Sequence, residues 1–152
     1  MAEPLLIDVW QASFDELYRK SDRLYYRLAR ECDLSESAYW VMYVVYVGGG
    51  EAPVATLTEE HNFSKQTVNS ALRQLKEKGL VTTEFCEGSR KSKRVIFTEE
   101  GREFAEQRIA PASQVERRAF NSLDLDERQE MIRLINKYVK ALDAELACSG
   151  KA

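Results

Sequence analysis

The segment SKQTVNSALRQLKEKGLV, residues 64–81, decides the predicted fold because it combines a helix start, an amphipathic helix and a helix stop. Ser64 is a favourable N-cap residue, and Gly79 is the type of residue that most often ends a helix in the left-handed conformation. Apolar residues recur on one face of the helix between them: Val68, Ala71, Leu72 and Leu75. We expect this face to pack against the rest of the protein.

The opposite face of the same helix is polar and carries Lys65, Gln66, Asn69, Ser70 and Arg73. Asparagine and glutamine pair with adenine edges in the major groove, arginine and lysine pair with guanine, and serine binds phosphates or bases. These five residues are therefore candidates for DNA contact, with Ser64 and Thr67 as candidate phosphate ligands at the helix start. An ordinary amphipathic helix with a solvated polar face would show the same pattern, so this helix alone does not decide the function.

The segments on either side of this helix strengthen the DNA-binding interpretation. Residues 56–59, Thr-Leu-Thr-Glu, have the form of a capping box and predict a short helix ending near Asn62, which gives a helix-turn-helix. Residues 80–85 and 93–98 are β-prone and flank the polar segment CEGSRKS, so they predict a hairpin with a basic tip. Arg90, Lys91 and Lys93 are its candidate DNA-contacting residues, because a basic hairpin at this place can reach a minor groove.

Long helices are predicted on both sides of this region. Apolar residues at helical spacing predict a helix over residues 11–32, and Ser35 caps a second one through Val47. The second segment is rich in valine and tyrosine, so a strand was the alternative. Gly48-Gly49-Gly50 and Pro53 end it.

The C-terminal third of the chain is also predicted to be helical. Thr98 can cap a helix that Pro111 kinks or divides, and residues 124–127 form a second capping box. The last helix carries an apolar stripe: Met131, Ile135, Tyr138, Leu142 and Leu146. The predicted fold class is mainly α with a small β-hairpin wing (α+β), a winged helix-turn-helix with long terminal helices in a single domain over residues 1–152.

The charges of the chain are unevenly distributed. The formal net charge is −3, yet residues 64–98 hold 8 basic and 3 acidic side chains and so carry +5. The segments before and after them carry −6 and −2. An acidic body with one basic segment suits a localised contact with a polyanion.

Composition and motifs exclude several other classes of protein. No apolar run approaches the roughly 18 residues of a membrane span, and the N-terminus has no basic region typical of a secretory signal. Three widely spaced cysteines indicate neither a disulfide framework nor a zinc site, and they fit a reducing cytoplasm. With His61 as the only histidine and no lysine after Gly48-Gly49-Gly50, neither a histidine triad nor a phosphate-binding P-loop is present. We therefore predict a non-enzymatic protein without metal or cofactor.

Residues 54–101 resemble the MarR family of bacterial transcription regulators. The resemblance rests on FSKQTV (63–68), LRQLKEKGLV (72–81) and FTEEG (97–101), the last similar to the family's Leu-Thr-x-x-Gly. It implies a homodimer, with dimerisation helices at about 11–34 and 110–148 and a DNA-binding lobe at about 35–101. It also implies palindromic operator DNA and repression relieved by a small ligand or by oxidation.

The sequence departs from the family pattern in the wing. Where the family has Asp-x-Arg this chain has Ser89-Arg90-Lys91, and Thr83 occupies the position of a second family arginine. We therefore expect a looser wing with weaker or differently distributed minor-groove contacts. The alternative function that follows from these departures is a protein-interaction module, or an antagonist of another regulator, with little DNA binding of its own.

Two sensing chemistries are conceivable from the sequence. Several aromatic residues lie close together in the first two helices and allow a pocket for an aromatic effector, although we favour the interpretation that they form the core: Tyr25, Tyr26, Tyr39, Trp40, Tyr43 and Tyr46. Oxidation of Cys32, Cys86 or Cys148 is the less favoured alternative, since a sensor cysteine must be exposed and have a low pKa.

Overall fold

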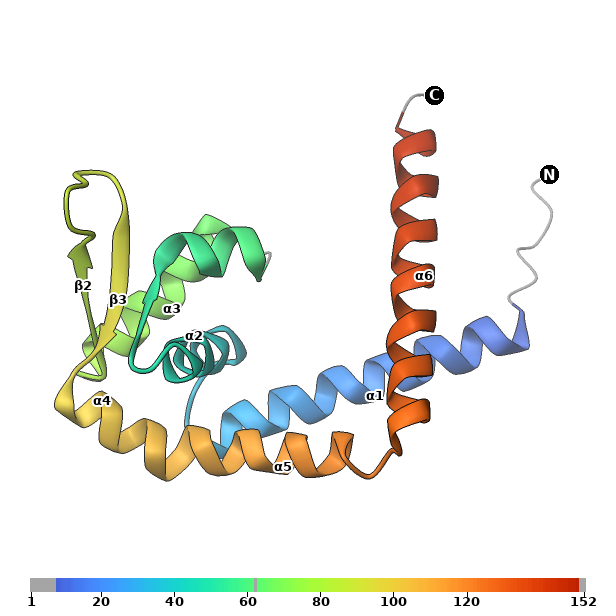
Figure 1. Ribbon diagram of the computed structural model, residues 1–152, viewed down its shortest axis with the longest axis horizontal. Helices are drawn as coiled ribbons and strands as arrows, with labels where there is room; N and C mark the ends of the chain where they lie inside the picture. The colour runs from blue at the N-terminus through green and yellow to red at the C-terminus, as the bar shows by residue number, and fades with distance from the viewer. Residues whose placement is uncertain (1–7, 62, 151–152) are drawn as a thin grey trace. The chain divides into compact units, whose positions relative to one another are not determined.

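The structure, a computed structural model, describes residues 8–61 and 63–150 and is mainly helical with a small antiparallel sheet (Figure 1). This confirms the predicted fold class, including the long N- and C-terminal helices. The elements are α1 (Val9–Glu31), α2 (Glu36–Val47), β1 (Glu51–Pro53), η1 (Thr56–Glu60), α3 (Lys65–Glu77), β2 (Val81–Phe85), β3 (Lys93–Phe97), α4 (Glu99–Phe104), η2 (Ala105–Ile109), α5 (Ala110–Phe120) and α6 (Leu125–Ser149). The chain forms two compact units that divide between Ser113 and Gln114.

Side-chain caps begin the helices where the sequence predicts them. The hydroxyl oxygens of Ser35, Ser64 and Thr98 accept hydrogen bonds from backbone N–H groups in the first turns of α2, α3 and α4. At α6, Asp124 and Glu127 form a reciprocal capping box, with distances of 2.8 and 2.9 Å. Residues 36–47 are helical, so the alternative of a strand there is wrong.

The prediction of a capping box at residues 56–59 is wrong. The chain is already helical at residues 54–55, and the position before η1 is Ala55, which supplies no side-chain cap. The Thr58 hydroxyl instead donates to the Ala55 carbonyl at 3.1 Å. η1 is a π-helical segment that ends at Glu60, and the predicted end at Asn62 lies outside the described residues.

The wing sheet has one strand more than the predicted hairpin. Its order is β1-β3-β2, and Glu51 of β1 pairs with Ile96 of β3. β1 has only three residues and ends in proline, so its sequence is too short to show the alternation of apolar and polar residues that predicts a strand. The two glycines before it form the turn that brings β1 to β3. Gly49 and Gly50 adopt φ values of +79° and +106°, which turn the chain back from α2 onto β3.

The helix that contains Pro111 continues through the proline instead of ending there. Its irregular part is η2, a π-helical segment over residues 105–109, where the Ala110 N–H donates to the Ala105 carbonyl. Proline has no N–H to donate to the carbonyl four residues earlier, so the regular pattern is lost just before it. Residues 99–120 are helical without a break, so the prediction that Pro111 divides the helix is wrong, and the irregular part lies in η2 on its N-terminal side.

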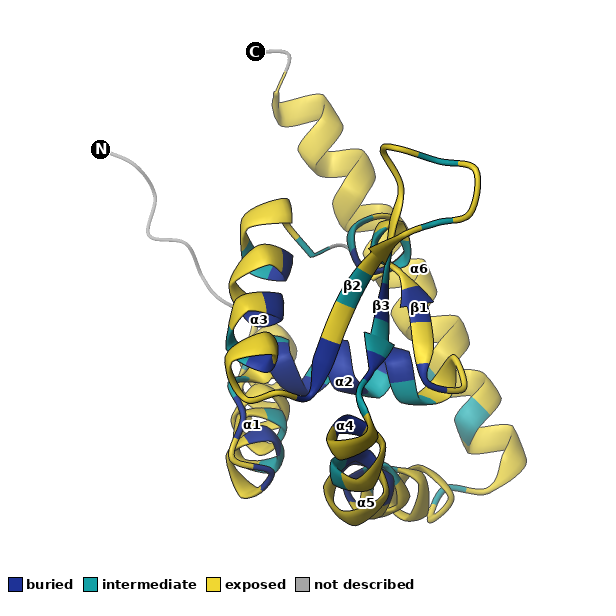
Figure 2. Cartoon of the chain, turned by 90° about the vertical axis from the view of Figure 1, so that its left-hand side faces the viewer, coloured by how far each residue is buried: buried dark blue, intermediate teal, exposed yellow. Residues whose placement is uncertain are grey.

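The core of the first unit is built around α2, which is apolar on most of its surface. Its fully or nearly fully buried residues are Ala38, Tyr39, Val41, Met42, Val44 and Val45. α3 packs on α2 through the four predicted apolar residues, each of which is buried. Figure 2 shows the consequence, since α3 is buried on the side toward the core and exposed on the other.

A close approach between two backbones places the wing beside α3. The Thr98 hydroxyl donates to the Gly79 carbonyl at 2.6 Å, and the Thr98 N–H donates to the Leu80 carbonyl at 3.1 Å. Gly101 lies directly against that same Leu80 carbonyl, so that a Cβ atom on Gly101 would overlap its oxygen. The Leu-Thr-x-x-Gly-like motif is thus a packing motif that connects the wing to the end of α3.

We expect Gly101→Ala to lower the free energy of unfolding by about 1–3 kcal/mol, because backbone atoms must move to accept the methyl group. Gly150→Ala is the matched control, since the nearest atom to its Cβ would be 3.6 Å away. Urea denaturation of the two variants measures the difference. Equal stability of both variants would contradict the packing argument.

Candidate nucleic-acid interface

The polar face of α3, formed by Lys65, Gln66, Asn69, Ser70 and Arg73, is exposed along the helix. At the start of α3, the Ser64 hydroxyl oxygen accepts from the Thr67 N–H at 3.0 Å and lies 2.8 Å from the Thr67 hydroxyl. Four of the polar side chains line one shallow hollow: Gln66, Asn69, Ser70 and Arg73. The structure thus brings most of the predicted α3 residues onto one accessible surface.

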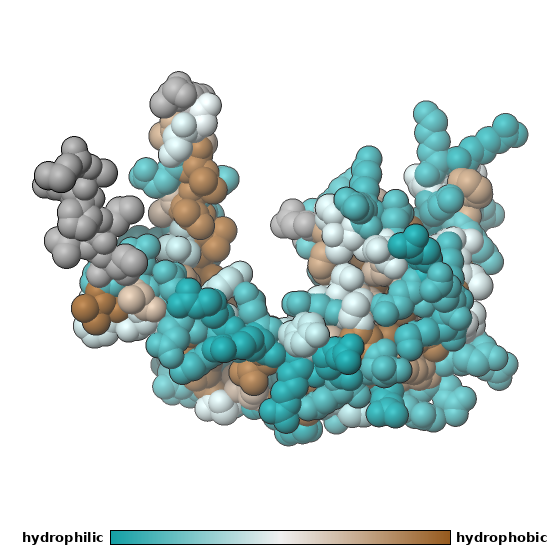
Figure 3. Space-filling view, turned by 180° about the vertical axis from the view of Figure 1, so that it is seen from behind, coloured by the Kyte–Doolittle hydropathy of each residue, from teal (hydrophilic) through white to brown (hydrophobic). Residues whose placement is uncertain are grey.

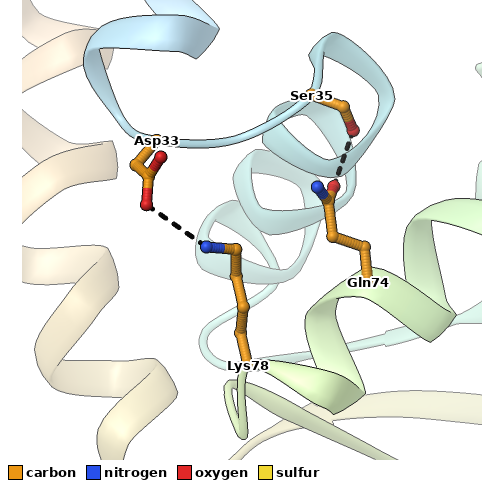
Figure 4. A network of polar contacts seen from close by, with 4 residues as sticks. All are labelled: Asp33, Ser35, Gln74 and Lys78. Atoms are coloured by element: carbon orange, nitrogen blue, oxygen red, sulfur yellow. Dashed lines mark hydrogen bonds and ion pairs between the residues drawn. The ribbon is translucent and has the colours of Figure 1, made fainter.

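Two polar contacts hold the C-terminal half of α3 (Figure 4). The Ser35 hydroxyl donates to the Gln74 side-chain oxygen at 2.7 Å, and the Lys78 ammonium lies 3.3 Å from the Asp33 carboxylate. Gln74 and Lys78 therefore belong to the support of α3 rather than to its polar face. Asp33 lies at the turn between α1 and α2 and has a φ of +57°.

Ser89 organises the tip of the wing, residues 86–92. Its hydroxyl oxygen accepts from the N–H groups of Lys91 and Ser92 at 3.2 and 2.9 Å. Below it, the Cys86 N–H donates to the Ser92 carbonyl at 2.8 Å. Ser89 thus gives the tip an acceptor where the family pattern has a carboxylate, and it leaves the charges of Arg90 and Lys91 uncompensated. The looser wing stays a prediction.

The basic side chains at the base of the wing differ in their partners. Arg94 lies between two carboxylates, at 3.1 Å from Glu51 and 3.5 Å from Glu84. Lys93 has its ammonium 5.1 Å from the centre of the Phe85 ring. Arg94 is therefore neutralised locally, whereas Arg90, Lys91 and Lys93 are exposed and in no ion pair with the part of the chain that the structure describes.

A groove of about 380 Å³ separates α3 from the wing. We call it the α3–wing groove, and its lining residues are Val54, Asn69, Leu72, Arg73, Lys76, Glu77, Thr83 and Lys93. It brings Asn69 and Arg73 together with Lys93 of the wing, while Arg90 and Lys91 lie in the tip. Lys76 is not among the DNA-contact residues predicted from the sequence, although its position three residues after Arg73 places it on the same side of the helix.

The aromatic residues of α1 and α2 are mostly part of the core. Tyr39 is fully buried, and Trp40 contacts the rings of Tyr25, Tyr39 and Tyr43 with centroid distances of 5.4–5.6 Å. Tyr26 is the exception, with 56% of its surface exposed. These contacts support the interpretation of the aromatic cluster as packing.

The three cysteines are free and differ in exposure. Burial raises the pKa of the Cys32 thiol, which lies 3.6 Å from the Arg108 carbonyl, so less of it is thiolate at neutral pH. Cys86 is half-buried in the wing and Cys148 is exposed near the end of α6. In residues 8–61 and 63–150 no three His, Cys, Asp or Glu side chains are grouped to hold a metal ion, and no helix is long and apolar enough to cross a membrane.

A protein-family model and several solved structures are similar to this chain. Residues 33–92, which include α2, α3 and the wing tip, match the family model described as MarR family. Over this segment, which is less than half of its length, the chain is similar to the MarR family.

Several solved structures of transcriptional regulators, two of them described as MarR family, share the fold over nearly the whole chain. AbsC from Streptomyces coelicolor has a TM-score of 0.73 at 17% identity and covers 93% of this chain and 99% of its own. Sco3205 from the same organism, solved in complex with DNA, has a TM-score of 0.69 at 18% identity and covers 93% of each chain. The organohalide-sensing regulator RdhR-CbdbA1625, bound to 2,4-dichlorophenol, has a TM-score of 0.65 at 15% identity and covers 92% of this chain and 89% of its own. Among curated protein sequences none matches this chain.

We predict that Ser89→Ala increases hydrogen exchange at the Lys91 and Ser92 amides, because both lose their acceptor. Ser89→Asp restores the acceptors and should restore slow exchange. Amide exchange measured by NMR on both variants tests this role of Ser89 in the wing. Unchanged exchange in Ser89→Ala would show that the tip does not depend on this hydroxyl.

Proposed function

We propose that this chain is a MarR-family transcription regulator, a homodimeric repressor that binds palindromic duplex DNA through the polar face of α3 and the wing. The observation that carries the proposal is the exposed, unneutralised charge on these two adjacent elements, in a chain whose net charge is −3. Residues 35–101 form the DNA-binding lobe in this proposal, and the whole chain acts as one functional domain in the cytoplasm.

Each predicted site residue has a role in this proposal. Ser64 and Thr67 hold a phosphate at the N-terminus of α3, where backbone N–H groups and the helix dipole favour an anion. The polar face of α3 enters the major groove and contacts base edges or the flanking phosphates. Arg90, Lys91 and Lys93 of the wing contact the adjacent minor groove or its phosphates.

The exposed apolar residues of the terminal helices support the dimer. α6 has no buried residue among those described, although one side of it is apolar (Figure 3). The large apolar residues exposed on it are Leu125, Ile132, Leu134, Ile135, Tyr138, Val139, Leu142 and Leu146. α1 exposes a second set: Val9, Trp10, Phe14, Leu17, Tyr18, Leu24 and Tyr26. Exposed apolar surface of this kind marks an interface, so we assign residues 11–34 and 110–148 to contact with a second copy.

A small-molecule effector that relieves repression completes the proposal. It is supported by the organohalide-sensing relative, whose structure holds 2,4-dichlorophenol. Oxidation of Cys32 is disfavoured because burial raises its pKa.

Selection of binding sites from a random duplex pool tests the proposal, followed by measurement of affinity against salt. We expect a palindrome, with the logarithm of affinity falling steeply as the logarithm of salt concentration rises. Arg73→Ala should weaken discrimination between specific and random DNA by about 1–3 kcal/mol, whereas Lys91→Ala should weaken binding to both and lower the salt slope by about 1 per protomer.

Two outcomes would contradict parts of this proposal. Equal losses on specific and random DNA for Arg73→Ala and Lys91→Ala would contradict the division of roles between α3 and the wing. Absence of any enriched sequence, with weak and salt-independent binding, would favour a protein-interaction module instead.

We expect Leu142→Glu to convert the dimer to a monomer, because it places a charge in the apolar stripe of α6. Lys140→Glu is the matched control, since residue 140 lies on the opposite side of the same helix. Light scattering coupled to size-exclusion chromatography gives the mass of each variant. A monomeric wild-type chain would remove the homodimer from the proposal.

A further inference from the structure

We propose that the α3–wing groove holds a phosphate group of the DNA backbone, and that Lys76, positioned by Thr83, is its principal ligand. This inference rests on the proposed function and extends it. Neither residue belongs to the α3 and wing positions predicted from the sequence. Thr83 is also where this chain departs from the arginine of the family pattern.

The position of the groove determines which part of the DNA it meets. In the proposed function α3 lies in the major groove and the wing lies at the adjacent minor groove. The sugar-phosphate backbone is what separates a major groove from its neighbouring minor groove, so a space between α3 and the wing must face that backbone. A groove of about 380 Å³ has ample room for one phosphate group and its water molecules.

The lining of the α3–wing groove is chemically suited to an anion. It contains three cationic side chains, Arg73, Lys76 and Lys93, against the single carboxylate of Glu77. Asn69 and Thr83 add neutral hydrogen-bonding groups, while Val54 and Leu72 are apolar. A net positive charge between two walls of the protein attracts a phosphate more strongly than the same charge on an open surface would.

The Lys76 ammonium has a hydrogen-bond partner within this lining. Its Nζ donates to the Thr83 hydroxyl oxygen at 2.7 Å, a contact that joins α3 to β2 across the groove. An ammonium group has three N–H donors, so two remain for a ligand, and the Thr83 hydroxyl keeps its own proton to donate. Thr83 thus replaces a long, flexible arginine with a short anchor that orients a lysine from the neighbouring helix.

The three cations of the α3–wing groove also differ from two neighbouring basic side chains, Lys78 and Arg94. Lys78 is paired with Asp33, and Arg94 is paired with Glu51 and Glu84. Within the described part of the chain, Arg73, Lys76 and Lys93 are in no ion pair. Their charge is therefore available to a ligand without loss of an existing salt bridge.

The first experiment compares the salt dependence of DNA binding for the wild-type chain and Lys76→Gln. We expect Lys76→Gln to bind on the order of tenfold more weakly at physiological salt and to lower the salt slope by about 0.9 per protomer, the value for one neutralised phosphate of B-DNA. Lys76→Arg should retain the slope. Arg108→Gln, which removes one positive charge from an exposed position on η2 outside both the DNA-binding lobe and the proposed dimer contacts, should leave both quantities unchanged.

The second experiment tests Thr83 as a positioning residue. Thr83→Val keeps the shape of the side chain and removes the hydroxyl, so we expect a smaller loss of affinity than in Lys76→Gln. The double variant should bind no more weakly than Lys76→Gln alone, because Thr83 acts through Lys76. Additive losses with an unchanged melting temperature would overturn the role of Thr83.

A DNA backbone phosphate and free phosphate share the same chemistry, so a third measurement separates them. A duplex with a single uncharged methylphosphonate at successive backbone positions should show one position per half-site that weakens the wild type but not Lys76→Gln. Saturation of the groove by millimolar inorganic phosphate without DNA, followed by shifts of the Lys76 resonances, would instead assign it to a small anion and overturn the proposal.

Failure of this inference differs from failure of the proposed function. If the wild-type chain shows no salt-dependent binding to any duplex, the proposed function fails and the inference fails with it. If the wild type binds a selected duplex and Lys76→Gln keeps its affinity and slope, only the inference is overturned.

Discussion

The packing of α3 on α2 is the interaction on which the rest of the site depends. Because Val68, Ala71, Leu72 and Leu75 are buried, the residues on the opposite side of the helix must face solvent. Apolar packing alone permits a helix to rotate or slide by small amounts. The polar contacts from Ser35 to Gln74 and from Asp33 to Lys78 add links between the C-terminal half of α3 and the segment between α1 and α2.

The wing is positioned by a different kind of contact. The Leu80 N–H donates to the Leu75 carbonyl at 2.9 Å, and the Leu80 carbonyl accepts from Thr98 while lying against Gly101. One short segment after α3 thus connects the helix to both ends of the hairpin. The charges of the wing differ between its base and its tip. Arg94 at the base is paired with Glu51 and Glu84, whereas Arg90 and Lys91 at the tip are in no ion pair within the described residues.

The sequence predicted the parts of the structure that depend on local interactions. The caps at Ser35, Ser64, Thr98 and Asp124 each use a side chain within three residues of the N–H group that it accepts, so their spacing is visible in the sequence. β1 was missed because its stability comes from pairing with β3, more than 40 residues away. Thr56 was wrongly predicted as a cap because the chain before it was already helical.

The candidate site likewise has parts that the sequence predicts and parts that it does not. The polar face of α3 follows from helical periodicity and needs no tertiary information. The contact of Lys76 with Thr83 and the neutralisation of Arg94 by Glu51 join different elements, and no spacing in the sequence indicates them. A basic segment therefore predicted how much charge the region has, but not which cations remain available to a ligand.

The most direct measurement is an NMR titration of the wild-type chain with a duplex selected from a random pool. The account predicts that the largest shifts of backbone amides lie in residues 64–73 and 86–94, with small shifts in the buried helix α2. Shifts confined to α1 or α6, or no shifts at duplex concentrations that saturate binding, would contradict the claim that α3 and the wing form the DNA-binding surface.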